Sequence, residues 1–90
     1  MPRYIVERRF AAGEPNSLTD AGPRGCAEVI ERNADGGVTW VHSYVARDGD
    51  RTFCVCDAPT PEAIRRTARR NGLPVDRITE VLVLDPYAYR

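Results

Sequence analysis

Apolar and polar residues alternate along two stretches, residues 38–45 and 51–57, which flank an Asp-Gly step. Both stretches are rich in β-branched and aromatic residues, and an Asp-Gly step between such stretches is a strong short-range signal for a β-hairpin. We therefore predict a hairpin over residues 38–57. It contains the single tryptophan, the single histidine and two of the three cysteines, so we expect any chemistry to lie here.

The register of this hairpin depends on its loop, because a shift by one residue changes which side chain lies opposite His42. A two-residue turn places His42 opposite Val55 or Asp57, according to where the turn falls. A three-residue loop places it opposite Cys56 instead. We favour the two-residue turns, because they bring the large side chains of both arms to one face. That face would carry Trp40, His42, Tyr44, Phe53 and Val55, and the other face Val41, Val45, Cys54 and Cys56.

Helical spacing and capping residues predict two helices. The first spans residues 16–34 and becomes regular near Pro23, because proline suits a first helical turn. The second begins with Thr60 as N-cap and Pro61 at the first helical position, and it ends at Gly72. The apolar face of the first helix carries residues spaced three and four apart, namely Cys26, Val29, Ile30 and Asn33.

Period-two patterns predict two further strands, at residues 4–10 and 78–84. The resulting order of strand, helix, strand, strand, helix, strand is the ferredoxin-like pattern. We predict an α+β sandwich in which two helices cover one face of a four-stranded antiparallel sheet, as a single domain over residues 1–90. The other face carries large aromatic side chains, and such a face is rarely left exposed. We therefore expect two copies to pack sheet to sheet as a homodimer.

Composition excludes several classes of protein. The 90 residues carry 13 basic and 13 acidic side chains, so no global positive field favours nucleic acid or an anionic membrane. No apolar run reaches the length of a membrane span, and the N-terminal residues lack a hydrophobic signal region, so we expect a cytoplasmic protein. An odd number of cysteines argues against a disulfide framework, and we expect free thiols.

Several motifs in order resemble a known family. They are Y-I-V-E-R, V-T-W-V-H-S-Y-V, F-C-V-C-D-A-P-T-P-E-A-I-R, N-G-L-P-V-D-R-I-T-E-V and L-D-P-Y. Together they resemble a family of small bacterial proteins, common in actinobacteria and formerly a domain of unknown function, of which at least one member is described as nickel-binding. The resemblance covers most of the chain apart from residues 11–25. It implies a dimeric ferredoxin-like fold and nickel as the bound metal.

The resemblance also implies site residues. His42 matches the histidine of W-V-H-S-Y-V, Cys54 the thiol of T-F-C-V, and Glu7 the acid of Y-I-V-E-R. Cys56 departs from the family, which more often has an aromatic residue at this position. Residues 21–25, rich in glycine and proline, are also atypical.

A neutral imidazole is a common ligand for nickel, zinc and copper. We therefore predict His42 as the nitrogen ligand of a divalent metal site. One histidine cannot form a site alone, so it needs carboxylates, thiolates, water or its mate across a two-fold axis. The carboxylate candidates are Glu7, Asp57 and Glu80, and Cys54 is the thiol candidate. Without the resemblance, a histidine packed among aromatic rings and cysteines buried as small apolar residues are the more ordinary interpretations.

Two other functions are compatible with the sequence. The first is a dimeric α+β barrel that binds or transforms a small organic molecule in a pocket lined by Trp40, Tyr44 and Phe53. The second is a partner-binding module that uses the arginines of the second helix, although a solvated face is the more ordinary role for them. The chain has no glycine-rich phosphate loop and no nucleophile elbow, so we expect a binding protein rather than an enzyme.

Overall fold

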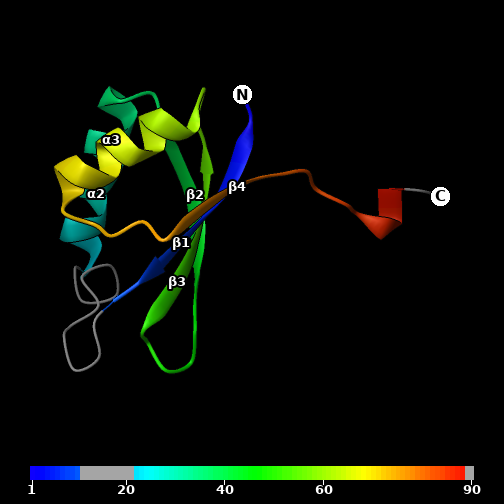
Figure 1. Ribbon diagram of the computed structural model, residues 1–90, viewed down its shortest axis with the longest axis horizontal. Coiled ribbons are helices and arrows are strands. Elements are labelled where there is room, and N and C mark those ends of the chain that lie inside the picture. Colours follow the sequence, from blue (N-terminus) through cyan, green and yellow to red (C-terminus); the bar gives the residue numbers. More distant parts are fainter. Residues whose placement is uncertain (11–21, 89–90) are drawn as a thin grey trace.

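The computed structural model describes residues 1–10 and 22–88, in which four strands form one antiparallel sheet in the order β2-β3-β1-β4. Both helices lie on one side of this sheet (Figure 1). The strand order and the alternation of strands and helices confirm the predicted ferredoxin-like α+β fold. The elements are β1 (Arg3–Arg9), α2 (Gly22–Asp35), β2 (Thr39–Val45), β3 (Arg51–Asp57), α3 (Pro61–Asn71), β4 (Arg77–Val81) and the 3-10 turn η1 (Pro86–Ala88).

The core lies between the helices and the face of the sheet that they cover, which we call the helix side. Val6 and Ile64 are its largest fully buried apolar side chains. On β1 and β3, alternate residues point into this core because successive side chains of a strand face opposite ways. The sheet contributes Tyr4, Val6, Cys54 and Cys56 to the core cluster, and α3 contributes Ala63 and Ile64.

The ends of α3 follow the predicted capping pattern. Thr60 Oγ1 accepts a hydrogen bond from the Ala63 amide at 3.2 Å, and Pro61 occupies the first helical position. Gly72 ends the helix in the left-handed conformation, with φ of 66°, which a residue without a Cβ adopts at little cost. These three residues are those predicted from the sequence.

The first helix differs from its prediction in one side chain. The described part begins at Gly22, with Pro23 in the first turn, and the predicted segment 16–21 lies outside the described residues. Asn33 is buried and Val29 is half-buried, whereas Ile30 is 52% exposed. The helix packs along Val29 and Asn33, and Ile30 lies about 100° further round the helix, because an α-helix turns once in 3.6 residues.

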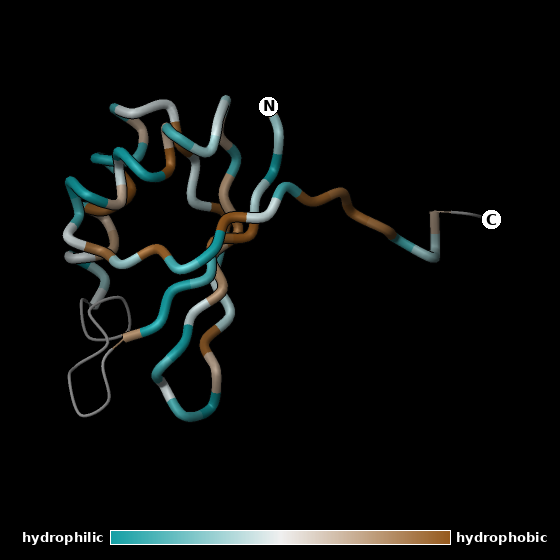
Figure 2. Tube along the Cα trace, viewed as in Figure 1, coloured by the Kyte–Doolittle hydropathy of each residue, from teal (hydrophilic) through white to brown (hydrophobic). Residues whose placement is uncertain are grey.

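The last strand is shorter than the prediction of residues 78–84, because it ends at Val81, opposite Arg3. The next partner on β1 would be Pro2, which has no N–H to donate to a ladder. Residues 82–88, which we call the C-terminal arm, leave the sheet on the side away from the helices (Figure 1). Its first three residues are Leu82, Val83 and Leu84, and this part of the chain is coloured as hydrophobic in Figure 2. No helix among residues 1–10 and 22–88 is long and apolar enough to cross a membrane.

Candidate metal centre on the uncovered sheet face

The hairpin has the register in which His42 lies opposite Val55, one of the two favoured from the sequence. Ala46 N donates to Arg51 O at 2.9 Å and closes a loop over residues 47–50, so the predicted two-residue turn is wrong although its register is right. Asp50 N donates to the Asp48 carboxylate at 2.9 Å inside this loop. This register separates His42 from the thiols. His42 and its partner Val55 point to one face of the sheet, whereas Cys54 and Cys56 point to the other.

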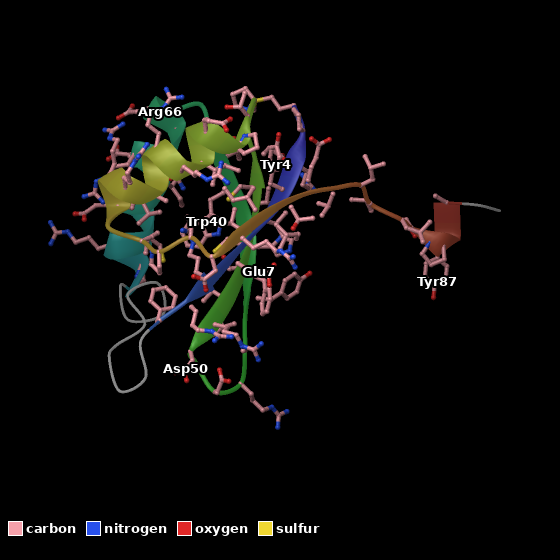
Figure 3. The ribbon with its side chains drawn as sticks, in the orientation of Figure 1. Tyr4, Glu7, Trp40, Asp50, Arg66 and Tyr87 are labelled. Atoms are coloured by element: carbon pink, nitrogen blue, oxygen red, sulfur yellow. The ribbon has the colours of Figure 1, made fainter. Side chains whose placement is uncertain are left out.

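A β-bulge interrupts β2 between Trp40 and His42. The extra residue, Val41, reverses the alternation, so that Trp40 pairs with Cys56 and packs against the core on the helix side. There its Nε1 donates to Ser43 Oγ at 2.8 Å. The prediction that Trp40 shares a face with His42 and Tyr44 is therefore wrong, and Figure 3 shows Trp40 and Glu7 on opposite sides of the sheet.

The face away from the helices, which we call the open face, is largely apolar and aromatic. The rings of His42 and Tyr44 meet edge to face, with centroids 5.1 Å apart and an interplanar angle of 89°. Both side chains are exposed, Tyr44 by 62%. Strand pairing places six side chains at the centre of this face, namely Ile5, Glu7, His42, Tyr44, Phe53 and Val55.

The structure divides the predicted metal ligands between the two faces. His42, Glu7 and Asp57 lie on the open face, whereas Cys54 is buried on the helix side. Glu80 pairs with the buried Tyr4 and so belongs to the helix side as well.

Even the ligands on the open face are not clustered. β3 lies between the strands that carry His42 and Glu7, which places these strands about 10 Å apart. Among the residues that the structure describes, no three histidine, cysteine, aspartate or glutamate side chains could hold a metal ion together. The described residues of one copy therefore do not fit a nickel ion.

Asp57 is already engaged by a neighbouring cation. Arg3 Nε donates to Asp57 Oδ1 at 2.8 Å, and Arg3 Nη2 donates to Oδ2 at 3.0 Å. These hydrogen bonds, with the charge of Arg3, lower the pKa of the Asp57 carboxyl below its ordinary value, and burial opposes the shift. A metal ion would have to displace Arg3 to use this carboxylate, so Asp57 is a poor ligand in one copy.

We predict that Arg3→Gln raises the pKa of Asp57 back toward about 3.9, the ordinary aspartate value. Because the folded-state pKa of Asp57 is lowered, its ion pair with Arg3 stabilises the protein at a pH above the ordinary aspartate pKa. This stabilisation is lost as the pH falls through the folded-state pKa of Asp57. A carboxyl-carbon NMR titration measures the shift directly. Arg9→Gln, an exposed arginine of the same strand, is the control. An unchanged Asp57 titration in Arg3→Gln would contradict the assignment.

The two hairpin cysteines are poor metal ligands as they stand. Both are buried free thiols. Burial raises the pKa of Cys56 to about 12, and the neighbouring Cys54 adds to the shift. A metal ligand must be a thiolate, and at neutral pH Cys56 is a neutral thiol.

The three side chains of the predicted organic-ligand pocket are not brought together either. Tyr44 and Phe53 are paired on the open face, whereas Trp40 lies on the helix side. Arg8, which the sequence did not single out, lies on the helix side and is only 7% exposed. The available signal was its alternation with Tyr4, Val6 and Phe10.

The fold, with one sheet face not covered by either described helix, defines the chain as a ferredoxin-like α+β protein. It belongs to a family described as "Nickel responsive protein SCO4226-like", whose model matches residues 4–81. The crystal structure of SCO4226 from Streptomyces coelicolor A3(2) has the same fold, with a TM-score of 0.64 and 17% sequence identity over 92% of this chain and 99% of that one. No curated protein matches the chain significantly.

Proposed function

We propose that this chain is a non-enzymatic nickel-binding protein that acts as a homodimer, with His42 as the nitrogen ligand. The observation that carries the proposal is the exposed position of the chain's single histidine on the open face. Membership of a nickel-responsive family supports the choice of metal. Imidazole and carboxylate side chains bind zinc and copper as well, so the proposal extends to these ions.

Two apolar features on the same side of the sheet support the homodimer. One is the open face, where the half-buried Ile5 and Phe53 lie in neighbouring strands. The other is the C-terminal arm, whose Leu82, Val83 and Leu84 are 94%, 72% and 76% exposed. A contiguous apolar surface of this kind marks an interaction site.

A second copy of the chain is the occupant that satisfies both features. The arm leaves the sheet on the side of the open face (Figure 1), so a copy that packs against this face lies within reach of the arm. In a two-fold arrangement each copy offers the other the same pair of surfaces. One contact then covers the open face and the arm of both copies.

The same arrangement supplies what one copy lacks for metal binding. A two-fold axis through the open face brings the His42 side chains of both copies to one interface, together with both Glu7 carboxylates. Two imidazoles, carboxylates and water are ligands that suit nickel. Cys54 does not take part in this proposal, because it lies on the helix side.

Calorimetric titration of the untagged protein with nickel, zinc and copper tests the metal site. We expect nickel binding in the native protein and its loss in His42→Ala, because no other histidine can replace the ligand. Glu28→Gln on α2 is the control, since this exposed carboxylate lies on the helix side. Unchanged nickel affinity in His42→Ala would refute the site.

A further inference from the structure

The exposed side of α3 carries a local positive charge, although the formal net charge of the chain is zero. The 11 residues of this helix include a single acidic side chain, Glu62, and four arginines. All four arginines are exposed, namely Arg65, Arg66, Arg69 and Arg70. The proposed metal site does not use them, because α3 lies on the side of the sheet away from the open face (Figure 1).

Two of these arginines are neighbours on the helix surface. Arg65 and Arg69 are four residues apart, and like charges at this spacing destabilise a helix. Arg65 Nη1 lies 3.5 Å from Glu62 Oε1, but both side chains are more than half exposed, and such a surface pair contributes little. Within residues 1–10 and 22–88, the ion pairs do not include Arg69. A carboxylate between Arg65 and Arg69 would replace their repulsion by charge-assisted hydrogen bonds.

A groove with an apolar floor lies beside these two arginines. Its volume is about 210 Å³, and Arg65 and Arg69 line it together with Ala68, Leu73 and Val75. Ala68 is buried, whereas Leu73 and Val75 are half-buried and pack against the core cluster. The segment that carries them is held at both ends, because Leu73 N donates to Ala68 O and Asp76 N donates to Glu7 O, each at 2.9 Å. The floor is therefore a fixed part of the fold.

The size of the groove indicates the kind of ligand that it holds. Pockets for small organic ligands usually have about 300–1,000 Å³ and enclose most of the ligand, whereas this groove is smaller and open to solvent. It suits one apolar side chain of a larger partner, since protein interfaces commonly place such an anchor in a pocket. Nucleic acid is the less suitable partner, because neither the groove nor α3 offers an aromatic ring on which a base could stack.

We propose that this groove docks a partner protein through a short acidic segment with one apolar side chain. The apolar side chain packs on Ala68, Leu73 and Val75, and carboxylates next to it pair with Arg65 and Arg69. The groove lies on the helix side, so it stays accessible when the open faces of two copies meet. The proposal is therefore independent of the homodimer and of the metal site, and either can fail without the other.

Methyl NMR of Leu73 and Val75 in the native protein tests both parts of this recognition. The probe is the peptide E-E-L-E-E with blocked ends, and its controls are E-E-S-E-E, which lacks the anchor, and Q-Q-L-Q-Q, which lacks the charges. We expect saturable shifts with E-E-L-E-E that weaken at higher salt. Both controls should bind about tenfold more weakly or less, the change expected when one buried side chain is lost. Equal binding of either control, or no saturable shift with E-E-L-E-E, would overturn the proposal.

Two double variants locate the charges that the peptide needs. Arg65→Gln/Arg69→Gln should abolish the saturable shifts. Arg47→Gln/Arg66→Gln should keep them, because it removes the same charge from exposed arginines that do not line the groove. Equal loss in both variants would show general charge attraction and overturn the proposal. An oligouridylate that shifts the same methyl signals at a lower concentration than the peptide would also overturn it, in favour of nucleic acid.

Discussion

Replacing Leu82 and Leu84 together by aspartate is expected to convert the homodimer into monomers. Burying one leucine side chain contributes about 1.5–3 kcal/mol to the free energy of association. Each substitution is present in both copies of a two-fold dimer, so its effect occurs twice. The double variant therefore loses on the order of 6 kcal/mol or more, which is most of the free energy of a micromolar dimer at about 8 kcal/mol. The fold itself should persist, because both side chains lie outside the sheet and the core.

Sedimentation equilibrium at tens of micromolar measures this effect. Ile30→Asp is the matched control, because Ile30 is an exposed apolar side chain of α2, on the other side of the sheet, and this variant should remain dimeric. A native protein that sediments as a monomer would refute the dimer. A double variant that stays dimeric would place the interface elsewhere than the arm. Nickel titration of the monomeric variant then tests whether the metal site needs both copies, and we expect binding to be lost.

Gly36→Ala is expected to destabilise the fold by about 1–3 kcal/mol, the usual range for overpacking a core. A Cβ at Gly36 would meet Thr67 Cγ2 closer than real Cβ atoms approach. Thr67 is buried in α3, so the two helices would have to move apart. Gly36 is not in the left-handed region of φ, and the expected effect is therefore steric. Urea denaturation followed by circular dichroism measures the change in the free energy of unfolding.

A second substitution separates this clash from other causes. Thr67→Ser removes the Cγ2 methyl group but keeps the hydroxyl that donates to Ile64 O at 3.0 Å. In the Gly36→Ala/Thr67→Ser double variant, most of the loss caused by Gly36→Ala should be recovered, which a double-mutant cycle reports as a coupling energy. Strictly additive effects would show that the helices do not depend on this contact.

Local signals in the sequence were sufficient to predict the helices and strands and part of the candidate metal centre. The Asp-Gly step favoured two registers, one of which places His42 opposite Val55 as in the structure, and Thr60 and Gly72 marked both ends of α3. Each of these features depends on neighbouring residues alone. For the same reason, the division of the hairpin side chains between two faces was right for His42 and for both cysteines.

The features that the sequence did not reveal depend on contacts between distant segments. The bulge that turns Trp40 toward the core reflects packing beneath the helices, and no turn residue marks it in the sequence. Alternation was a reason to extend β4 through Leu84, but the strand ends where Pro2 ends the partner strand. Arg8 occupies a position on β1 that alternation assigns to the core, but its charged side chain is of a kind usually found at the surface. Only the folded structure shows that it is buried.

The bulge at Val41 makes β2 sensitive to the length of the chain rather than to the identity of this residue. Val41 is 40% exposed, so evolution can exchange its side chain at little cost. Deleting it would restore strict alternation, and one of its two neighbours would then change face. Either the indole of Trp40 would leave the core, or the imidazole of His42 would enter it. Relatives of this protein should therefore vary in residue type at Val41 but tolerate neither an insertion nor a deletion there.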